Sequence, residues 1–144
     1  MNWQCGLIAE PLLSRGAMMT IGLYAGLLGL IYIFLSYRVI AGRRHYRVAL
    51  GDNHIAPLQR CIRVHGNFME YVPFALILLL LLELNGMPPL LLHLLGGLLV
   101  LGRVLHAYGV NAEQENLRFR ISGMVATINV LLVASLVLIG SALG

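Results

Sequence analysis

Residues Gln59–Pro73 read QRCIRVHGNFMEYVP and open one of the long apolar segments of the chain. Written as an α-helix, this segment gathers its polar side chains within an arc of about 100°. They are Arg60, Arg63, Asn67, Glu70 and Tyr71. A charged group at the centre of a membrane costs on the order of 2.5–3.5 kcal/mol. A polar stripe on a helix that then becomes fully hydrophobic is therefore expected to face protein, water or a ligand.

The composition is that of an integral membrane protein. Of the 144 residues, 59% are hydrophobic and only 11% are charged, and the mean hydropathy is +0.84. Soluble proteins carry about 25% charged residues. All ten basic residues are arginines at the ends of apolar segments, so the positive-inside bias explains them better than a nucleic-acid partner does. Cys5 and Cys61 lie far apart in sequence, and neither a disulfide nor a metal site is predicted.

Four apolar segments are long enough to cross about 30 Å of hydrocarbon. They predict an all-α membrane protein, a bundle of four transmembrane helices in a single domain over residues 1–144. The expected helices cover residues 16–42, 55–84, 89–110 and 117–143. One face of the first helix carries three glycines, a pattern suited to close helix packing: Gly22, Gly26 and Gly29. Asp52 or Asn53 is expected to cap the second helix.

The arginines are distributed unevenly between the two ends of the predicted bundle. Arg15 lies at one end, and the other nine gather at the opposite end. They are Arg38, Arg43, Arg44, Arg47, Arg60, Arg63, Arg103, Arg118 and Arg120. This distribution predicts that the arginine-rich end is cytoplasmic and that both termini face the outer side. A bacterial inner membrane, with the termini in the periplasm, is the expected location; an internal eukaryotic membrane is the alternative.

The positive charge at the arginine-rich end exceeds what acidic residues can balance. Glu70 lies about 10 Å from Arg63 along the helix axis, so its expected partner is an arginine of another helix, Arg103. The surplus suggests an anionic ligand, because guanidinium groups bind carboxylates and phosphates through paired hydrogen bonds. The mixture of donors and one acceptor suits a zwitterion, whereas His65 points away and is expected to be structural. For three arginines, the alternative to ligand binding is that their side chains extend to lipid phosphates. They are Arg43, Arg44 and Arg118.

The polar stripe has the pattern Arg-x-x-Arg-x-x-x-Asn-x-x-Glu-Tyr, followed by Val72 and Pro73. In this pattern and in the order of its segments, the chain resembles the MAPEG family, the membrane-associated proteins in eicosanoid and glutathione metabolism. Residues 39–47, VIAGRRHYR, are also similar to those of the family's leukotriene synthases. The chain resembles a bacterial-type member related to the microsomal glutathione transferases and to the leukotriene and prostaglandin synthases. The resemblance implies a homotrimer that binds glutathione between subunits near the cytoplasmic side.

The resemblance also implies a set of site residues. Either Arg118 or Arg120, at the start of the fourth helix, would lie beside the thiol. A cation there lowers the pKa of the thiol, and only the thiolate is nucleophilic. Glutathione carries two carboxylates and one ammonium group, which suits several arginines and one or two carboxylates. The residues that would bind it are Arg43, Arg60, Arg63, Asn67, Glu70, Tyr71, Arg103 and His106.

The expected function is that of a glutathione-dependent membrane transferase or peroxidase with a detoxifying role. It would conjugate hydrophobic electrophiles or reduce lipid hydroperoxides held in an apolar groove between helices. Its partners would be further copies of the chain, membrane lipids and the lipophilic substrate, with no nucleic acid. A non-catalytic lipid-binding or scaffold protein on the same fold is the alternative. A transporter is disfavoured because only Glu83 places an acidic group in the outer half of the predicted bundle.

Overall fold

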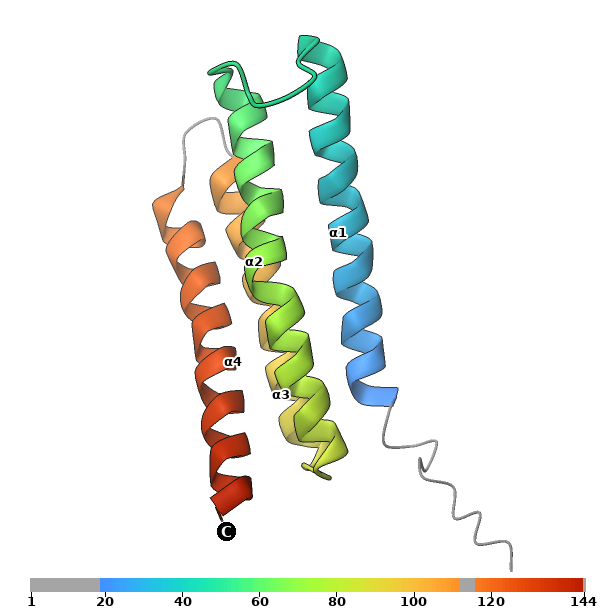
Figure 1. Cartoon of the computed structure of the whole chain (residues 1–144). Coiled ribbons are helices and arrows are strands. Elements are labelled where there is room, and N and C mark those ends of the chain that lie inside the picture. The colour runs from blue at the N-terminus through green and yellow to red at the C-terminus, as the bar shows by residue number, and fades with distance from the viewer. Residues whose placement is uncertain (1–18, 112–115, 144) are drawn as a thin grey trace, which may run out of the picture.

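The computed structural model describes residues 19–111 and 116–143 (Figure 1). Four helices run alternately up and down, and each is long and apolar enough to cross a membrane. They are α1 (Met19–Tyr46), α2 (Ala56–Leu84), α3 (Pro89–Asn111) and α4 (Leu117–Leu143). The predicted all-α bundle with four membrane-spanning helices is therefore confirmed. The α1–α2 connection lies at one end of the bundle and the C-terminus at the other.

Helix α1 extends about one turn beyond the predicted end at residue 42; residues 16–18 of its predicted start lie outside the described residues. The helix ends in a Schellman motif, in which Arg47 adopts a φ of 55°. The amide of Val48 donates to the carbonyl of Arg43 over 3.0 Å, and the amide of Arg47 donates to the carbonyl of Arg44 over 3.3 Å. Arg43 and Arg44 were expected to follow the helix but belong to its last turn. Cations at this position interact favourably with the helix dipole.

The loop before α2 does not contain the predicted cap. Ile55 is the N-cap residue, and it makes no side-chain hydrogen bond to the helix. The carboxylate of Asp52 instead accepts from the amide of His54 over 2.9 Å, and the Asp52 carbonyl accepts from the amide of Ile55 over 2.9 Å. The prediction that Asp52 or Asn53 caps α2 was therefore wrong, because Asp52 is used to close a turn within the loop.

Glu83, near the end of α2, caps the beginning of α1. Its carboxylate is buried and accepts hydrogen bonds from the backbone amides of Thr20 (3.2 Å) and Ile21 (3.3 Å). The first amides of a helix have no partner within the helix, and an anion there also complements the helix dipole. This contact fixes the beginning of α1 against the end of α2 and explains why an acidic residue is buried there.

A second contact between α1 and α2 involves His65, which was expected to be structural. The Ser36 hydroxyl donates to the carbonyl of Tyr32 over 2.9 Å, and its oxygen lies 3.1 Å from Nε2 of His65. The rings of Tyr32 and His65 are stacked, with their centroids 5.2 Å apart. The Ser36 hydroxyl links the Tyr32 carbonyl of α1 to the His65 ring of α2. His65 thus serves helix packing.

Helices α3 and α4 approach each other closely because glycines lie at their contact. A Cβ atom on Gly123 would come within 2.5 Å of both the Gly102 carbonyl oxygen and the His106 backbone nitrogen. A Cβ atom on Gly109 would come within 2.5 Å of the backbone nitrogen of Arg120. These contacts bring the C-terminal half of α3 and the N-terminal half of α4 together, which is where the arginines of both helices lie.

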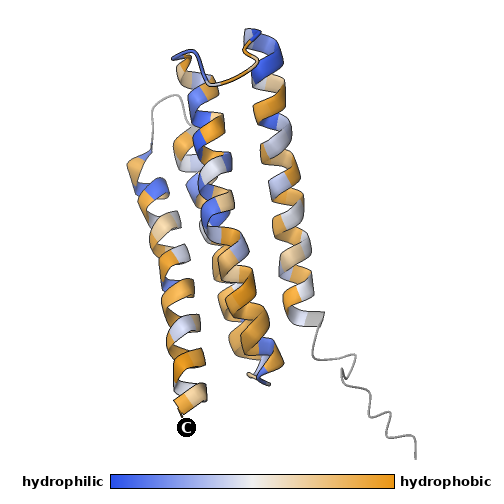
Figure 2. Ribbon diagram, in the orientation of Figure 1, coloured by the Kyte–Doolittle hydropathy of each residue, from blue (hydrophilic) through white to orange (hydrophobic). Residues whose placement is uncertain are grey.

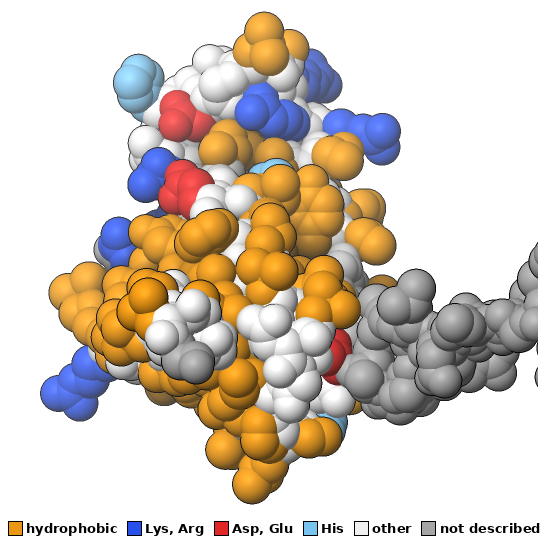
Figure 3. Space-filling model, turned by 60° about the horizontal axis from the view of Figure 1, so that its bottom comes forward, with side chains coloured by type: hydrophobic (Ala, Val, Ile, Leu, Met, Phe, Trp, Pro, Cys, Tyr) orange, Lys and Arg blue, Asp and Glu red, His pale blue; other side chains and the backbone are white. Residues whose placement is uncertain are grey.

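Three of the four glycines of α1 behave differently. A Cβ atom on Gly22, Gly26 or Gly29 would meet nothing within 4 Å. The small-residue face predicted for close packing is therefore open in the single subunit. Hydrophilic residues gather at the end that carries the α1–α2 connection (Figure 2), whereas most of the remaining surface is hydrophobic, including the face seen in Figure 3. Many apolar side chains point outward, as expected for helices surrounded by lipid or by other subunits.

The glycine contact between α3 and α4 predicts different effects on thermal stability for two alanine substitutions within α4. Gly123→Ala is expected to lower the thermal unfolding temperature in detergent, because its methyl group would meet backbone atoms that cannot move without separating the helices. The matched control is Gly140→Ala, since a Cβ atom there meets nothing within 4 Å. This control is expected to be neutral or to stabilise the helix by up to about 1 kcal/mol. Equal destabilisation by both variants would contradict the assigned contact.

Candidate functional site

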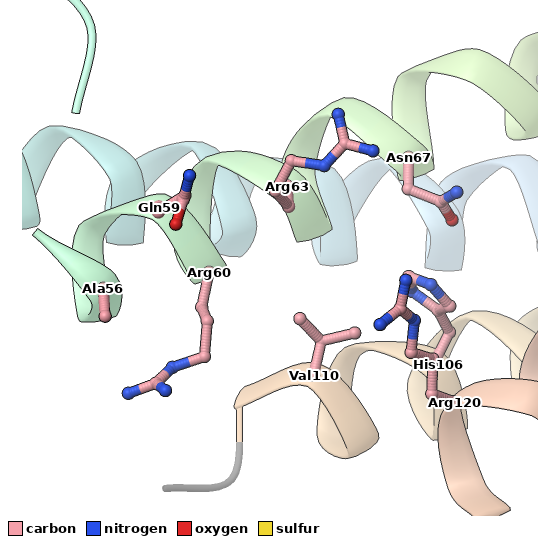
Figure 4. Close-up of a pocket in the computed structure, with 8 residues that line it drawn as sticks. All are labelled: Ala56, Gln59, Arg60, Arg63, Asn67, His106, Val110 and Arg120. Carbon is pink, nitrogen blue, oxygen red and sulfur yellow. The ribbon is translucent and has the colours of Figure 1, made fainter. Parts of the chain in front are cut away.

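A pocket of about 410 Å³ lies at the arginine-rich end, between α2, α3 and α4. Figure 4 shows its lining residues projecting from the three helices. They are Ala56, Gln59, Arg60, Arg63 and Asn67 from α2, His106 and Val110 from α3, and Arg120 from α4. Five of these eight residues belong to the set predicted from the sequence. Gln59, Ala56 and Val110 were not predicted, although Gln59 belongs to the same polar segment of α2.

The wall formed by α2 comes directly from the helical spacing of its sequence. Arg60, Arg63 and Asn67 follow one another at intervals of three and four residues and therefore share one face. Arg63 is exposed, and Arg60 and Asn67 are partly buried. Like charges at this spacing repel each other, so an anion between the two guanidinium groups would relieve their repulsion.

Arg103 of α3 lies behind this wall and is almost completely buried, with 2% of its surface exposed. Its Nη1 donates to Oδ1 of Asn67 over 2.8 Å, and its Nη2 lies 3.5 Å from the sulfur of Met124. Its guanidinium carbon lies 5.8 Å from the centre of the Tyr71 ring, within the range of a cation–π contact. Its Nε has no hydrogen-bond partner among the described residues. Arg103 thus joins α2, α3 and α4.

The sequence predicted Glu70 as the partner of Arg103, and the structure corrects this. Among residues 19–111 and 116–143, no ion pair joins Arg103 to Glu70. The side chain of Glu70 is exposed, and Asn67 accepts the hydrogen bond from Arg103 instead. Asn67 lies three residues before Glu70 in α2, and its side chain faces Arg103 of α3. Since its oxygen is engaged by Arg103, the amide nitrogen of Asn67 remains to donate toward the pocket.

The opposite wall combines His106 and Val110 of α3 with Arg120 of α4. His106 is buried with 6% of its surface exposed, and Arg120 is exposed. The close approach of Gly109 to the Arg120 backbone brings the two helices together at this point. Arg118, the other candidate for the position beside a thiol, is exposed and is not among the residues that line the pocket.

Arg43 and Glu70 are not brought into this pocket by the single chain. Arg43 lies at the end of α1, where its Nη1 donates to the carbonyl of Ala49 over 3.1 Å. Tyr71 lies beneath the guanidinium group of Arg103 and is not a lining residue. The predicted set therefore separates into residues that line the pocket, residues that support its wall and residues that point elsewhere.

The chemistry of the lining residues suits an anionic ligand with several polar groups. Three guanidinium groups can bind carboxylates, and the amides of Gln59 and Asn67 and the ring of His106 add neutral hydrogen-bonding groups. No carboxylate is present among the described residues that line it. An ammonium group on the same ligand would therefore find no carboxylate partner among these lining residues.

Comparisons with known proteins identify the family of the chain. The MAPEG family matches residues 21–140 of the chain, which includes all four helices almost completely. The chain is also 42% identical over 109 residues to the inner membrane protein YecN of Escherichia coli strain K12, over 76% of this chain and 82% of that protein. The same protein from Escherichia coli O6:H1 matches equally well. The four apolar helices and this relative support a multi-pass inner membrane protein. The chain belongs to the MAPEG family, whose members are membrane proteins of eicosanoid and glutathione metabolism.

Proposed function

We propose that this protein is a glutathione-dependent membrane transferase or peroxidase acting on hydrophobic electrophiles or lipid hydroperoxides. The observation that carries the proposal is the basic pocket inside an apolar bundle, with Arg60, Arg63 and Arg120 among its lining residues. Guanidinium groups that line one pocket can bind carboxylates through paired hydrogen bonds, and glutathione offers two carboxylates. Membership of a family that uses glutathione supports the same ligand.

The walls of the pocket suggest a division of roles among its residues. Arg60 and Arg63 would bind carboxylates of glutathione, and the amide nitrogen of Asn67 would donate to a carbonyl or carboxylate oxygen. Arg103 would act as a positioning residue, because its contacts with Asn67 and Tyr71 hold them in place while its own guanidinium group stays buried. Glu70 would accept from the ammonium group.

Arg120 is the better candidate for activation of the thiol, because it lines the pocket whereas Arg118 does not. A cation beside the sulfur favours the thiolate over the thiol. Bound glutathione would supply the sulfur nucleophile, which displaces a leaving group from an electrophile. With a second glutathione it would instead reduce a hydroperoxide to an alcohol and water, and the two glutathiones would be oxidised to glutathione disulfide. His106, on the same wall, would help to orient this end of the ligand. Apolar substrates would reach the site from the bilayer.

We further propose a homotrimer with both termini on the periplasmic side. The open face of Gly22, Gly26 and Gly29 and the outward-pointing apolar side chains leave surface for neighbouring subunits. Native mass spectrometry in detergent is expected to give a particle of three times 15.8 kDa. A monomer as the predominant species under conditions where glutathione still binds would contradict the proposed assembly.

The first test of the ligand compares two exposed arginines at the same end of the protein. Arg63→Ala is expected to abolish glutathione binding in isothermal titration calorimetry, because it removes a charged hydrogen-bond donor from the pocket wall. Arg44→Ala is expected to change the affinity little, because Arg44 lies outside this pocket. Equal losses in the two variants would indicate nonspecific attraction to a basic surface.

The second test separates an enzyme from a scaffold and Arg120 from Arg118. On addition of glutathione, the wild-type protein is expected to develop the ultraviolet absorbance of a thiolate and to conjugate chlorodinitrobenzene. Arg120→Ala is expected to lower both signals by roughly 100-fold, the effect of losing one electrostatic contact to a developing charge, and Arg118→Ala to preserve them. Glutathione binding without thiolate in the wild-type protein would favour the non-catalytic alternative.

A further inference from the structure

A second basic pocket, of about 420 Å³, lies where α1 ends and the chain turns toward α2. It shares no lining residue with the pocket between α2, α3 and α4. Its described lining residues include no acidic group; they are Ile40, Arg43, Arg44, Arg47, Val48 and Ala49. Three guanidinium groups beside an apolar wall are suited to a phosphate group that belongs to an apolar molecule.

The shape of this second pocket is built by the backbone. The Schellman motif at the end of α1 turns the chain back at Arg47 and buries Val48 against the bundle. Arg43 is held by its hydrogen bond to the carbonyl of Ala49 across the turn. The exposed side chains of Arg44 and Arg47 therefore extend from a fixed rim, and each retains its full set of charged donors for a ligand.

The depth of the second pocket matches the phosphate layer of a membrane. Helix α1 has 28 residues, and at 1.5 Å per residue it is about 42 Å long, which exceeds the hydrocarbon thickness of about 30 Å. Its outer end is fixed near Thr20 by the buried carboxylate of Glu83. The last turns of α1, including Arg43 and Arg44, are thus expected to emerge into the headgroup region.

An apolar track leads from this pocket along the outer face of α1. Ile33, Tyr37 and Ile40 lie at helical spacing below Arg44 and share its face. Their side chains are 63%, 67% and 49% exposed. Ile40 also lines the pocket itself, so the basic rim and the apolar track are continuous. A soluble phosphate would use only the rim, whereas a phospholipid would use both.

We propose that this pocket binds the phosphate of an anionic phospholipid through Arg44 and Arg47, with an acyl chain along Ile33, Tyr37 and Ile40. The lipid would be a specific ligand of the end of α1. The site is independent of the proposed glutathione pocket, because the lining residues differ.

The test uses the delipidated full-length protein and native mass spectrometry with equal amounts of phosphatidylglycerol and phosphatidylcholine that carry the same acyl chains. The wild-type protein is expected to retain phosphatidylglycerol preferentially. The double variant Arg44→Ala/Arg47→Ala is expected to retain it roughly tenfold less. The matched control is Arg63→Ala, which removes an exposed arginine at the same end but outside the pocket. If the double alanine variant fails to fold, Arg44→Lys/Arg47→Lys keeps the charge, loses the paired hydrogen bonds and is expected to give a smaller loss.

Three results would overturn the proposal. Equal retention of the two lipids would remove the role of charge, and equal losses in the double variant and in Arg63→Ala would indicate a diffuse basic surface. Displacement of phosphatidylglycerol by inorganic phosphate at comparable concentrations would assign the rim to a soluble anion. Glutathione binding measured on the same variants distinguishes the two sites, because the proposed glutathione site predicts its loss only in Arg63→Ala.

Discussion

The arginine-rich half of this bundle depends on one buried charge, the guanidinium group of Arg103. Such a group in an apolar interior is stable only when protein groups replace its water. It finds them on two other helices, through Asn67 and Tyr71 on α2 and Met124 on α4. A rotation of any of these helices would separate the guanidinium group from these partners. Arg103 therefore fixes the register of α2, α3 and α4, and with it the wall on which Asn67 faces the pocket.

The sequence was sufficient for the four spans and for the polar face of α2, because both depend on local composition and helical period. Arg60, Arg63 and Asn67 line the pocket for this reason. The partner of Arg103 could not be predicted, since Glu70 and Asn67 lie less than one turn apart and only the rotation of α3 selects between them. The end of α1 was misplaced because a Schellman motif depends on a backbone turn at Arg47, a residue with no strong preference for that conformation.

Glycine positions decide which helices form the site. Gly102, Gly109 and Gly123 let α3 and α4 approach until backbone atoms are in contact, so His106 and Arg120 share one wall. Gly22, Gly26 and Gly29 of α1 make no such contact, and side-chain groups attach α1 to α2 instead. The basic pocket consequently forms among α2, α3 and α4. The arginines of α1 are left at a separate place, which is consistent with two different anionic ligands at one end of the protein.

The absence of a carboxylate among the described residues lining the first pocket has a consequence for assembly. A ligand with two carboxylates and one ammonium group would leave the ammonium unpaired in a single subunit, at a cost of several kcal/mol if it were buried. Glu70 is exposed on α2 and forms no ion pair with Arg103 among the described residues, so it is available to a neighbouring copy. The proposed glutathione site is thus electrostatically complete only if a second subunit supplies a carboxylate, and the same residue makes the proposed trimer and the proposed ligand depend on each other.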